Sequence, residues 1–381
     1  MPEGPELHMA SRFVNHVCSD RMFSGAIFKS EVSHKNPEIP WNEKSYTISA
    51  TSRGKEVKLT LHTMDNKTTK TSKPPKIPKS MDIIFRFGMS GKFQFTSDSP
   101  KDIHKHAHLQ FFTDGSPKKV LSFVDVRRFG KWEVNGDWGK QRGPCVLFEY
   151  DAFRKNVLDN LSTAAFDRPI CEAMLNQKFF NGIGNYLRAE ILYRLHIPPF
   201  VCARDVLEPL KLQGDTKVKS ETPDLLAMCN IVPLEVVNLG GKGYDPEGGA
   251  EQYSEFSQWL QCYYQPGMSN IADHNKRTMW FSGPPGPMIP KDAKTRATKK
   301  RQKKNKVSEE EEEESPIKSK SQNKRVKKEE VDTNSKVTRK TKAASKRRST
   351  SSGPTPAKNK KTQKEENGPG NVRRSRRLKT K

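Results

Sequence analysis

The strongest constraint on how this chain can fold is a break in composition at Lys291. From Lys291 to Lys381 the chain contains no Phe, Trp or Tyr and few aliphatic residues. The same segment holds 32 Lys and Arg against 12 Asp and Glu, a net charge of +20 out of +25 for the whole chain. Such a segment cannot bury enough apolar surface to offset the entropy lost on folding. We therefore expect a disordered basic tail over 291–381 behind a folded part.

The folded part has the composition of an ordinary globular protein. Residues 1–290 hold 37 basic and 32 acidic residues, and they are long enough for two domains. Residues 1–30 lack the apolar run of a secretory signal, and no segment approaches the ~18–20 apolar residues of a membrane span. The six cysteines are scattered without a Cys-x-x-Cys pair, which favours buried thiols over a disulfide framework or a zinc site.

The first half of the folded part has the pattern of a β domain behind one short helix. Residues 5–17 place Leu7, Ala10, Val14 and Val17 on one helical face. Apolar and polar residues then alternate in five segments, which we predict to be strands: 46–50, 57–61, 83–87, 93–95 and 120–126. Residues 62–80 form a polar loop. Several strands in series behind one helix predict a β-sandwich.

The second half changes to a helical pattern after a glycine-rich junction at 136–143. We predict helices at 151–160, 168–178, 185–195, 222–229, 233–238 and 251–261, with a flexible glycine-rich loop at 240–249. Residues 262–289 return to short β or loop character. The fold class is therefore α+β, with predicted boundaries at 1–135 (β-sandwich domain), 136–150 (linker), 151–261 (helical domain), 262–290 (β hairpin) and 291–381 (tail).

The first six residues, Met1-Pro2-Glu3-Gly4-Pro5-Glu6, carry the most specific chemistry. Methionine before a small residue is normally removed, so the mature chain would begin with the secondary amine of Pro2. At neutral pH the nucleophilic fraction of a terminal amine is roughly a few hundred times that of a lysine. A secondary amine that condenses with an aldehyde gives a permanently charged iminium, an electron sink, beside the Glu3 carboxylate.

Three further segments have a functional and an ordinary interpretation. Ser52-Arg53-Gly54-Lys55-Glu56 is a basic turn between two strands, or simply a solvated hairpin tip. Asn181-Gly182-Ile183-Gly184-Asn185 would place Asn185 at a helix N-cap, where free backbone N–H groups suit a phosphate; alone it is a plain helix–turn–helix. Arg277, in Lys276-Arg277-Thr278-Met279-Trp280-Phe281, lies on a hairpin, where an arginine is usually a surface charge.

Together and in this order, these features make residues 1–290 resemble the formamidopyrimidine-DNA glycosylase/endonuclease VIII family of base-excision repair enzymes. The N-terminal Pro2-Glu3-Gly4-Pro5-Glu6 matches the family signature, and Gly182-Ile183-Gly184-Asn185 matches its helix–two-turn–helix motif. The resemblance implies that 151–261 is a helix–two-turn–helix DNA-binding domain. Most of the family closes with a four-cysteine zinc finger. Here 264–270 and 281–286 stand where the Cys-x-x-Cys pairs would lie, and only Cys262 is near.

Because zinc needs four ligands, we expect 262–290 to be a zincless finger, with no metal and no cofactor in the protein. Loss of the metal would leave Trp280, Phe281 and the prolines to hold the hairpin by packing. The resemblance places Arg277 on this hairpin, directed at DNA.

The resemblance also implies roles for individual residues. Pro2 and Glu3 are the catalytic pair, with Lys55 as proton donor and phosphate contact. Asn185 and Arg277, with Lys55, would hold the phosphates around a lesion. The residues that fill the space of the everted base would be Met89, Arg127 and Phe129; for Phe129, folding back on the core is a serious alternative. Lys242 and Tyr244 would close over the everted base, although a plain surface loop is nearly as good an interpretation.

The implied activity is that of a bifunctional DNA glycosylase and AP lyase, which removes oxidised pyrimidines and ring-opened purines by Schiff-base chemistry and β,δ-elimination. Its partners would be damaged double-stranded, bubble and single-stranded DNA, with no membrane. The tail would serve nuclear import, phosphate attraction or docking of other repair or replication proteins. We expect a nuclear monomer. The alternatives are a non-catalytic DNA-binding or chromatin protein, and a related enzyme that prefers oxidised purines.

Overall fold

The computed structural model describes residues 2–64, 79–213, 222–240, 252–293 and 296–297. The chain divides into two units, 1–306 and 307–381, and all the described residues belong to the first. That unit has the predicted α+β fold. No helix within the described ranges is long and apolar enough to cross a membrane.

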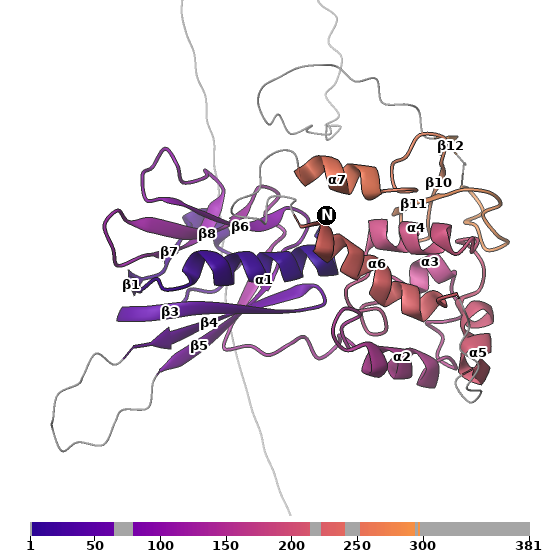
Figure 1. Ribbon diagram of the computed structural model, residues 1–381, viewed down its shortest axis with the longest axis horizontal. Helices are drawn as coiled ribbons and strands as arrows, with labels where there is room; N and C mark the ends of the chain where they lie inside the picture. Colours follow the sequence, from indigo (N-terminus) through magenta and orange to yellow (C-terminus); the bar gives the residue numbers. More distant parts are fainter. Residues whose placement is uncertain (1, 65–78, 214–221, 241–251, 294–295, 298–381) are drawn as a thin grey trace, which may run out of the picture. The chain divides into compact units, whose positions relative to one another are not determined.

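The first helix forms as the sequence predicts. Helix α1 (Gly4–Cys18) begins with a capping box, in which the backbone N–H of Glu3 donates to the Glu6 carboxylate at 2.9 Å. Its predicted apolar face is buried, and the helix packs against the neighbouring sheet (Figure 1). The side chains that hold α1 in place thus also fix the position of the residues that precede it.

Two antiparallel sheets form the β-sandwich, which confirms that prediction (Figure 1). The first sheet has the order β1 (Phe23–Ala26), β3 (Asn42–Arg53), β4 (Glu56–Thr63), β5 (Ser80–Arg86), β9 (Lys131–Val134). The second has the order β2 (Phe28–Lys29), β7 (Ala107–Phe112), β8 (Lys119–Asp125), β6 (Gly91–Ser97), and a 3₁₀ turn, η1 (Glu31–Ser33), follows β2. Aromatic rings join the sheets: Phe85 of β5 lies 5.2 Å from Phe93 and 5.0 Å from Phe123 between ring centroids.

The five predicted strands correspond to β3, β4, β5, β6 and β8, whereas four shorter strands escaped prediction. Helices follow in the second half: α2 (Tyr150–Asp159), α3 (Ile170–Ala173), α4 (Asn185–Arg194), α5 (Ala203–Gln213), α6 (Leu225–Leu239) and α7 (Gln252–Trp259). Three helix predictions were wrong. Helix α3 is much shorter than 168–178, α5 was missed, and 222–229 and 233–238 are one helix that continues through Pro233.

A small sheet ends the described part of the chain. Its order is β11 (Thr278–Phe281), β10 (Ser269–Ala272), β12 (Arg296–Ala297), and β10 and β11 form an antiparallel hairpin. Because β12 pairs with β10, ordered backbone continues beyond the predicted start of the tail at Lys291. Backbone hydrogen bonds to a sheet edge do not require the apolar side chains that this segment lacks.

A carboxylate at the end of the predicted linker binds the sandwich. Glu149 accepts a hydrogen bond from Arg53 Nε at 2.8 Å and another from the backbone N–H of Cys145 at 2.7 Å. Arg53 is the last residue of β3, next to the turn that carries Lys55. The connection between the sandwich and the helices is therefore anchored beside that turn.

Candidate active site

The Glu3 carboxylate lies at the N-terminus of α4. It is buried, with 1% of the residue exposed, and it accepts hydrogen bonds from the backbone N–H of Tyr186 at 2.9 Å and of Leu187 at 3.3 Å. The prediction of a phosphate site at this helix start was therefore wrong, because the chain's own carboxylate takes these amides. The N-cap is Gly184, and Asn185 is the first helical residue rather than the cap.

Glycines make this approach possible. A Cβ atom on Gly184 would lie 2.2 Å from the Glu3 carboxyl carbon, so a side chain there would displace the carboxylate. The backbone N–H of Gly4 donates to the carbonyl of Gly182 at 2.8 Å, and Gly182 has a φ of +122°, which L side chains rarely adopt. The glycines of the predicted motif thus bring the start of α1 against the start of α4.

A second carboxylate adjoins Glu3. Glu6 accepts from the Tyr186 hydroxyl at 3.1 Å as well as from the Glu3 backbone. Burial raises the pKa of the Glu3 carboxyl above its usual range, the Lys55 ammonium lowers it, and the Glu6 carboxylate raises it further. Pro2, half-buried, directly precedes this carboxylate. An amine at Pro2 would thus stand beside a carboxyl group whose proton affinity is raised.

Lys55 lies on the predicted turn, between Arg53 and Glu56, the paired ends of β3 and β4. Burial lowers its pKa to about 8; the nearby Glu3 carboxylate opposes this shift, while the charges of Arg142 and Arg277 add to it. Because each of these effects requires proximity, Lys55 shares one electrostatic environment with Glu3 and Arg277. A lysine with this pKa can give up and accept a proton near neutral pH.

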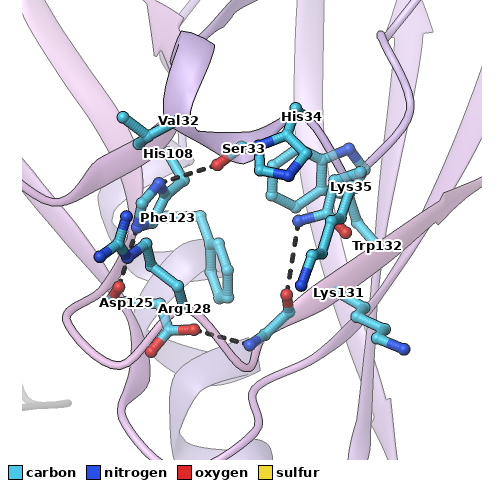
Figure 2. Close-up of a pocket in the computed structure, with 12 residues that line it drawn as sticks. Val32, Ser33, His34, Lys35, His108, Phe123, Asp125, Arg128, Lys131 and Trp132 are labelled. Atoms are coloured by element: carbon cyan, nitrogen blue, oxygen red, sulfur yellow. Dashed lines mark hydrogen bonds between the residues drawn. The ribbon is translucent and has the colours of Figure 1, made fainter.

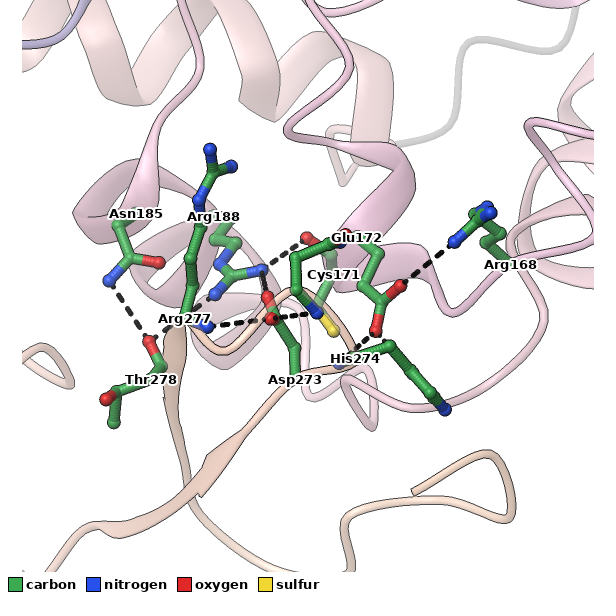
Figure 3. Close-up of polar contacts among 10 residues, drawn as sticks. Arg168, Cys171, Glu172, Asn185, Arg188, Asp273, His274, Arg277 and Thr278 are labelled. Atoms are coloured by element: carbon green, nitrogen blue, oxygen red, sulfur yellow. Dashed lines mark hydrogen bonds and ion pairs between the residues drawn. The ribbon is translucent and has the colours of Figure 1, made fainter. Parts of the chain in front are cut away.

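Two of the three predicted phosphate ligands, Asn185 and Arg277, come together across α4 and the β10–β11 hairpin. The Asn185 side-chain amide donates to the carbonyl of Thr278 at 3.0 Å, so it touches the residue that follows Arg277. Arg277 lies in the hairpin turn with its side chain exposed (Figure 3). Pro2, Glu3, Lys55, Asn185 and Arg277 thus belong to one region, although they come from four distant segments.

Met89, Arg127 and Phe129 form a second group, on two turns of the sandwich that are tied together. The Ser90 hydroxyl accepts from the backbone N–H of Arg127 at 2.9 Å and donates to Asp125. Met89 is 40% and Phe129 55% exposed, so Phe129 does not fold back on the core. The Arg127 guanidinium lies over the Phe129 ring at 5.5 Å. The three side chains therefore offer an apolar surface with one charge.

Lys242 and Tyr244, predicted to close over a base, lie outside the described residues. The position where the family would bind zinc does not fit a metal. Cys262 is its only cysteine, and burial raises the pKa of this thiol to about 12, against the thiolate that zinc requires. Among the described residues, no group of three or more His, Cys, Asp or Glu could hold a metal ion.

Sequence reasoning missed the buried charges of α4 and its neighbour α3. Arg188 is fully buried against Asp273; Glu190 accepts from the backbone N–H groups of 261, 262 and 263; and Glu172 accepts from the His274 ring at 2.6 Å. These contacts join segments about 70 to 100 residues apart, so they cannot be predicted from a local sequence pattern. They hold the β10–β11 hairpin and the segment before it, in addition to the predicted packing of Trp280 and Phe281, which are buried.

A separate pocket opens on the sandwich between η1 and the strands β7, β8 and β9 (Figure 2). Phe123 and Trp132 line it together with the charged side chains of Lys35, Arg128 and Lys131. Both ring nitrogens of His108 in its wall are already hydrogen-bonded, to Ser33 and to the Asp125 carbonyl. None of the predicted site residues lines this pocket.

Comparison with known proteins gives concordant results. The family model "Formamidopyrimidine-DNA glycosylase N-terminal domain" matches residues 1–132, and "Endonuclease VIII-like 1, DNA bind" matches 252–290. Endonuclease 8-like 1 of Mus musculus is 53% identical over 309 residues, with 78% of this chain and 77% of that protein covered; the Homo sapiens protein is 52% identical with the same coverage.

Solved structures show the same fold. The MutM (Fpg) protein of Thermus thermophilus aligns with a TM-score of 0.53 at 20% identity, over 74% of this chain and 97% of that one. Lactococcus lactis Fpg, in complex with DNA that contains an oxidised pyrimidine, aligns with a TM-score of 0.53 at 19% identity and the same coverage.

Proposed function

The chain belongs to the formamidopyrimidine-DNA glycosylase/endonuclease VIII family, and from this membership we propose that it is a bifunctional DNA glycosylase and AP lyase of base-excision repair. It releases a damaged base from DNA and then cleaves the strand at the abasic site. The observation that carries this function is the position of the buried Glu3 carboxylate at the start of α4, directly after Pro2 and within the electrostatic range of Lys55.

Pro2 is the nucleophile once Met1 has been removed. Its amine nitrogen attacks C1′ of the deoxyribose as the glycosidic bond breaks; the electron pair of that bond leaves with the base, which takes up the proton that the amine loses. Glu3 gives a proton to the ring oxygen of the sugar, which opens the ring and leaves an iminium between Pro2 and C1′. The raised pKa of the Glu3 carboxyl supports this role, because a carboxylic acid can donate only while it is protonated.

The iminium then directs strand cleavage. It acidifies the neighbouring C2′ proton, so the 3′ phosphate leaves by β-elimination, and a second elimination expels the 5′ phosphate. A one-nucleotide gap with phosphate ends remains. Lys55 donates protons and contacts phosphate during these steps; a pKa of about 8 supports this role, since the group is charged yet able to exchange its proton near pH 7.

Asn185 and Arg277, with Lys55, bind the phosphates around the lesion and keep the strand kinked. In this proposal, Gly182-Ile183-Gly184-Asn185 are part of a helix–two-turn–helix motif within 151–261, and 262–290 is a zincless finger that carries Arg277. Met89, Arg127 and Phe129 fill the space that the everted base leaves. Their exposure on tied turns supports this, because a wedge must be presented rigidly between base steps.

Lys242 and Tyr244 belong to the proposed lesion loop that closes over the everted base. The substrates are oxidised pyrimidines and ring-opened purines in duplex, bubble or single-stranded DNA. We infer this range from the resemblance of the sequence to the family. A strand-cleavage panel of these lesions in the three contexts tests it, with analysis of the product ends. We expect cleavage with phosphate at both ends; cleavage of oxidised purines alone would favour the related purine-specific enzyme.

The protein acts on DNA in the nucleus as a monomer, without metal or cofactor, and its basic tail attracts phosphate or docks other repair or replication proteins. The alternative, a non-catalytic DNA-binding or chromatin protein, would be favoured by a retained Met1, which blocks the amine. Mass spectrometry of the purified protein decides between the two. A chain that begins at Pro2 supports the enzyme, and a chain that retains Met1 supports the binding protein.

A further inference from the structure

Asp273 organises the turn that presents Arg277. One carboxylate oxygen accepts the backbone N–H groups of Asn275 and Arg277, each at 2.9 Å. The backbone N–H of Asp273 donates to the Arg277 carbonyl at 2.9 Å, and that of Lys276, which has a φ of +62°, donates to the Asp273 carbonyl. Both backbone polar groups of Arg277 are therefore bonded to one residue, while its side chain is exposed.

The other oxygen of Asp273 ties this turn to α4. It accepts from Arg188 Nη1 at 2.8 Å, and both side chains are fully buried (Figure 3). Arg188 also donates to the carbonyls of Cys171 at 2.8 Å and Thr278 at 3.4 Å. Its guanidinium thus joins the end of the hairpin turn to two helices.

The same face of α4 carries a predicted phosphate ligand. Asn185 and Arg188 are one helical turn apart, and both donate to the carbonyl of Thr278. The backbone between Arg277 and Thr278 is consequently held from the turn side by Asp273 and from the helix side by these two residues. A buried ion pair is weak evidence for net stability, and here it joins the hairpin turn to α4.

We propose that Asp273, anchored on Arg188, is a positioning residue that aims the Arg277 guanidinium at DNA phosphate. This inference rests on the proposed phosphate contact of Arg277. For the loss of the Asp273 charge, the positioning role and simple electrostatics predict opposite changes in DNA affinity. Removal of an acidic residue next to a DNA contact should tighten binding, whereas removal of a positioning carboxylate should weaken it.

The test measures the affinity of the full chain for a duplex with a tetrahydrofuran abasic-site analogue, as a function of salt concentration. The variants are Asp273→Asn, Arg277→Ala and the double variant, and Asp114→Asn, on an exposed turn of the sandwich, is the charge-matched control. The slope of log K against log salt is negative, and we expect Arg277→Ala to make it about 0.9 less steep, the value for one phosphate contact. Asp273→Asn should also make the slope less steep, and it should weaken binding on the order of tenfold. The double variant should equal Arg277→Ala.

Each other outcome has a defined meaning. Tighter binding or an unchanged slope for Asp273→Asn, or additive losses in the double variant, overturns the positioning role. An unchanged slope for Arg277→Ala overturns the phosphate contact itself, and the inference with it. If Asp273→Asn does not fold, the variant Arg188→Lys is used in its place. Lysine keeps the positive charge but cannot bind several acceptors at once as the Arg188 guanidinium does. The same loss is expected from Arg188→Lys, and wild-type binding would overturn the inference.

Discussion

The carboxylate of Glu3 accepts a hydrogen bond from the backbone N–H of Tyr186, 183 residues further along the chain, at 2.9 Å. This one contact joins the start of α1, on the β-sandwich, to the start of the helix that follows the glycine-rich motif. Because Pro2 directly precedes Glu3, the contact also fixes the position of Pro2, whose nitrogen we propose as the reactive amine. The two most specific motifs of the sequence are therefore parts of a single site.

Replacement of Glu3 by Gln should abolish base release while leaving DNA affinity largely unchanged. Glutamine keeps an oxygen for the helix amides but cannot donate a carboxyl proton, and loss of general acid catalysis costs about 10²–10⁴ in rate. Single-turnover base release and binding to an abasic-site analogue measure the two effects. Glu208→Gln, on α5 with an exposed side chain, should behave as wild type. Weak binding by Glu3→Gln would show that this residue mainly holds the fold.

Gly184→Ala should slow base release, because its Cβ would lie 2.2 Å from the Glu3 carboxyl carbon and would push the carboxylate from the helix start. Gly184 is extended, with a φ of −131°, so alanine is not strained by its backbone conformation. The control is Gly115→Ala, where nothing lies within 4 Å of the added atom. Rates and melting temperatures should be measured together. An active Gly184→Ala variant would mean that the exact place of Glu3 matters little.

Activity should fall as pH rises through about 8, the pKa of Lys55, because Lys55 donates protons only in its charged form. Lys55→Arg should slow cleavage and remove this falling limb, since a guanidinium stays charged but does not release its proton near neutral pH. Rates of strand cleavage from a preformed abasic site, measured across pH, isolate the step. If the falling limb stays in place in the arginine variant, another group is the donor.

Phe129→Ala and Met89→Ala should reduce excision from duplex DNA more than from single strands, because only a duplex leaves an unpaired position to fill. Phe28→Ala is the matched control: this phenylalanine on β2 is 52% exposed, against 55% for Phe129. The ratio of duplex to single-strand rates is the measurement. Equal losses on both substrates would point to a structural role.

The parts of the fold that depend on local pattern could be predicted from the sequence. Strand β4 alternates apolar and polar residues from Val57 to His62, and α1 has a clear apolar face. The break predicted between 229 and 233 was wrong, because α6 continues through Pro233, with Val232 and Val236 buried on either side. Tertiary packing thus outweighs the lost hydrogen bond. Helix α5, which was not predicted, also continues through an internal proline, Pro209.

The site was predictable in its residues but not in its connections. The resemblance supplied Glu3, Lys55, Asn185 and Arg277, and the structure brings them into one region. The partner of the helix amides was predicted to be phosphate, because the sequence does not show that Glu3 reaches them. Arg188 and Asp273 lie 85 residues apart, so the sequence around either residue does not predict their ion pair.

The most direct test of the account is to trap the covalent intermediate. Borohydride is added to the protein with lesion-containing DNA, and the cross-linked peptide is sequenced by mass spectrometry. We expect an adduct on the nitrogen of Pro2, in a chain from which Met1 has been removed. An adduct on Lys55 or another lysine, or none under conditions where the strand is cut, would contradict the assignment of the terminal amine as the nucleophile.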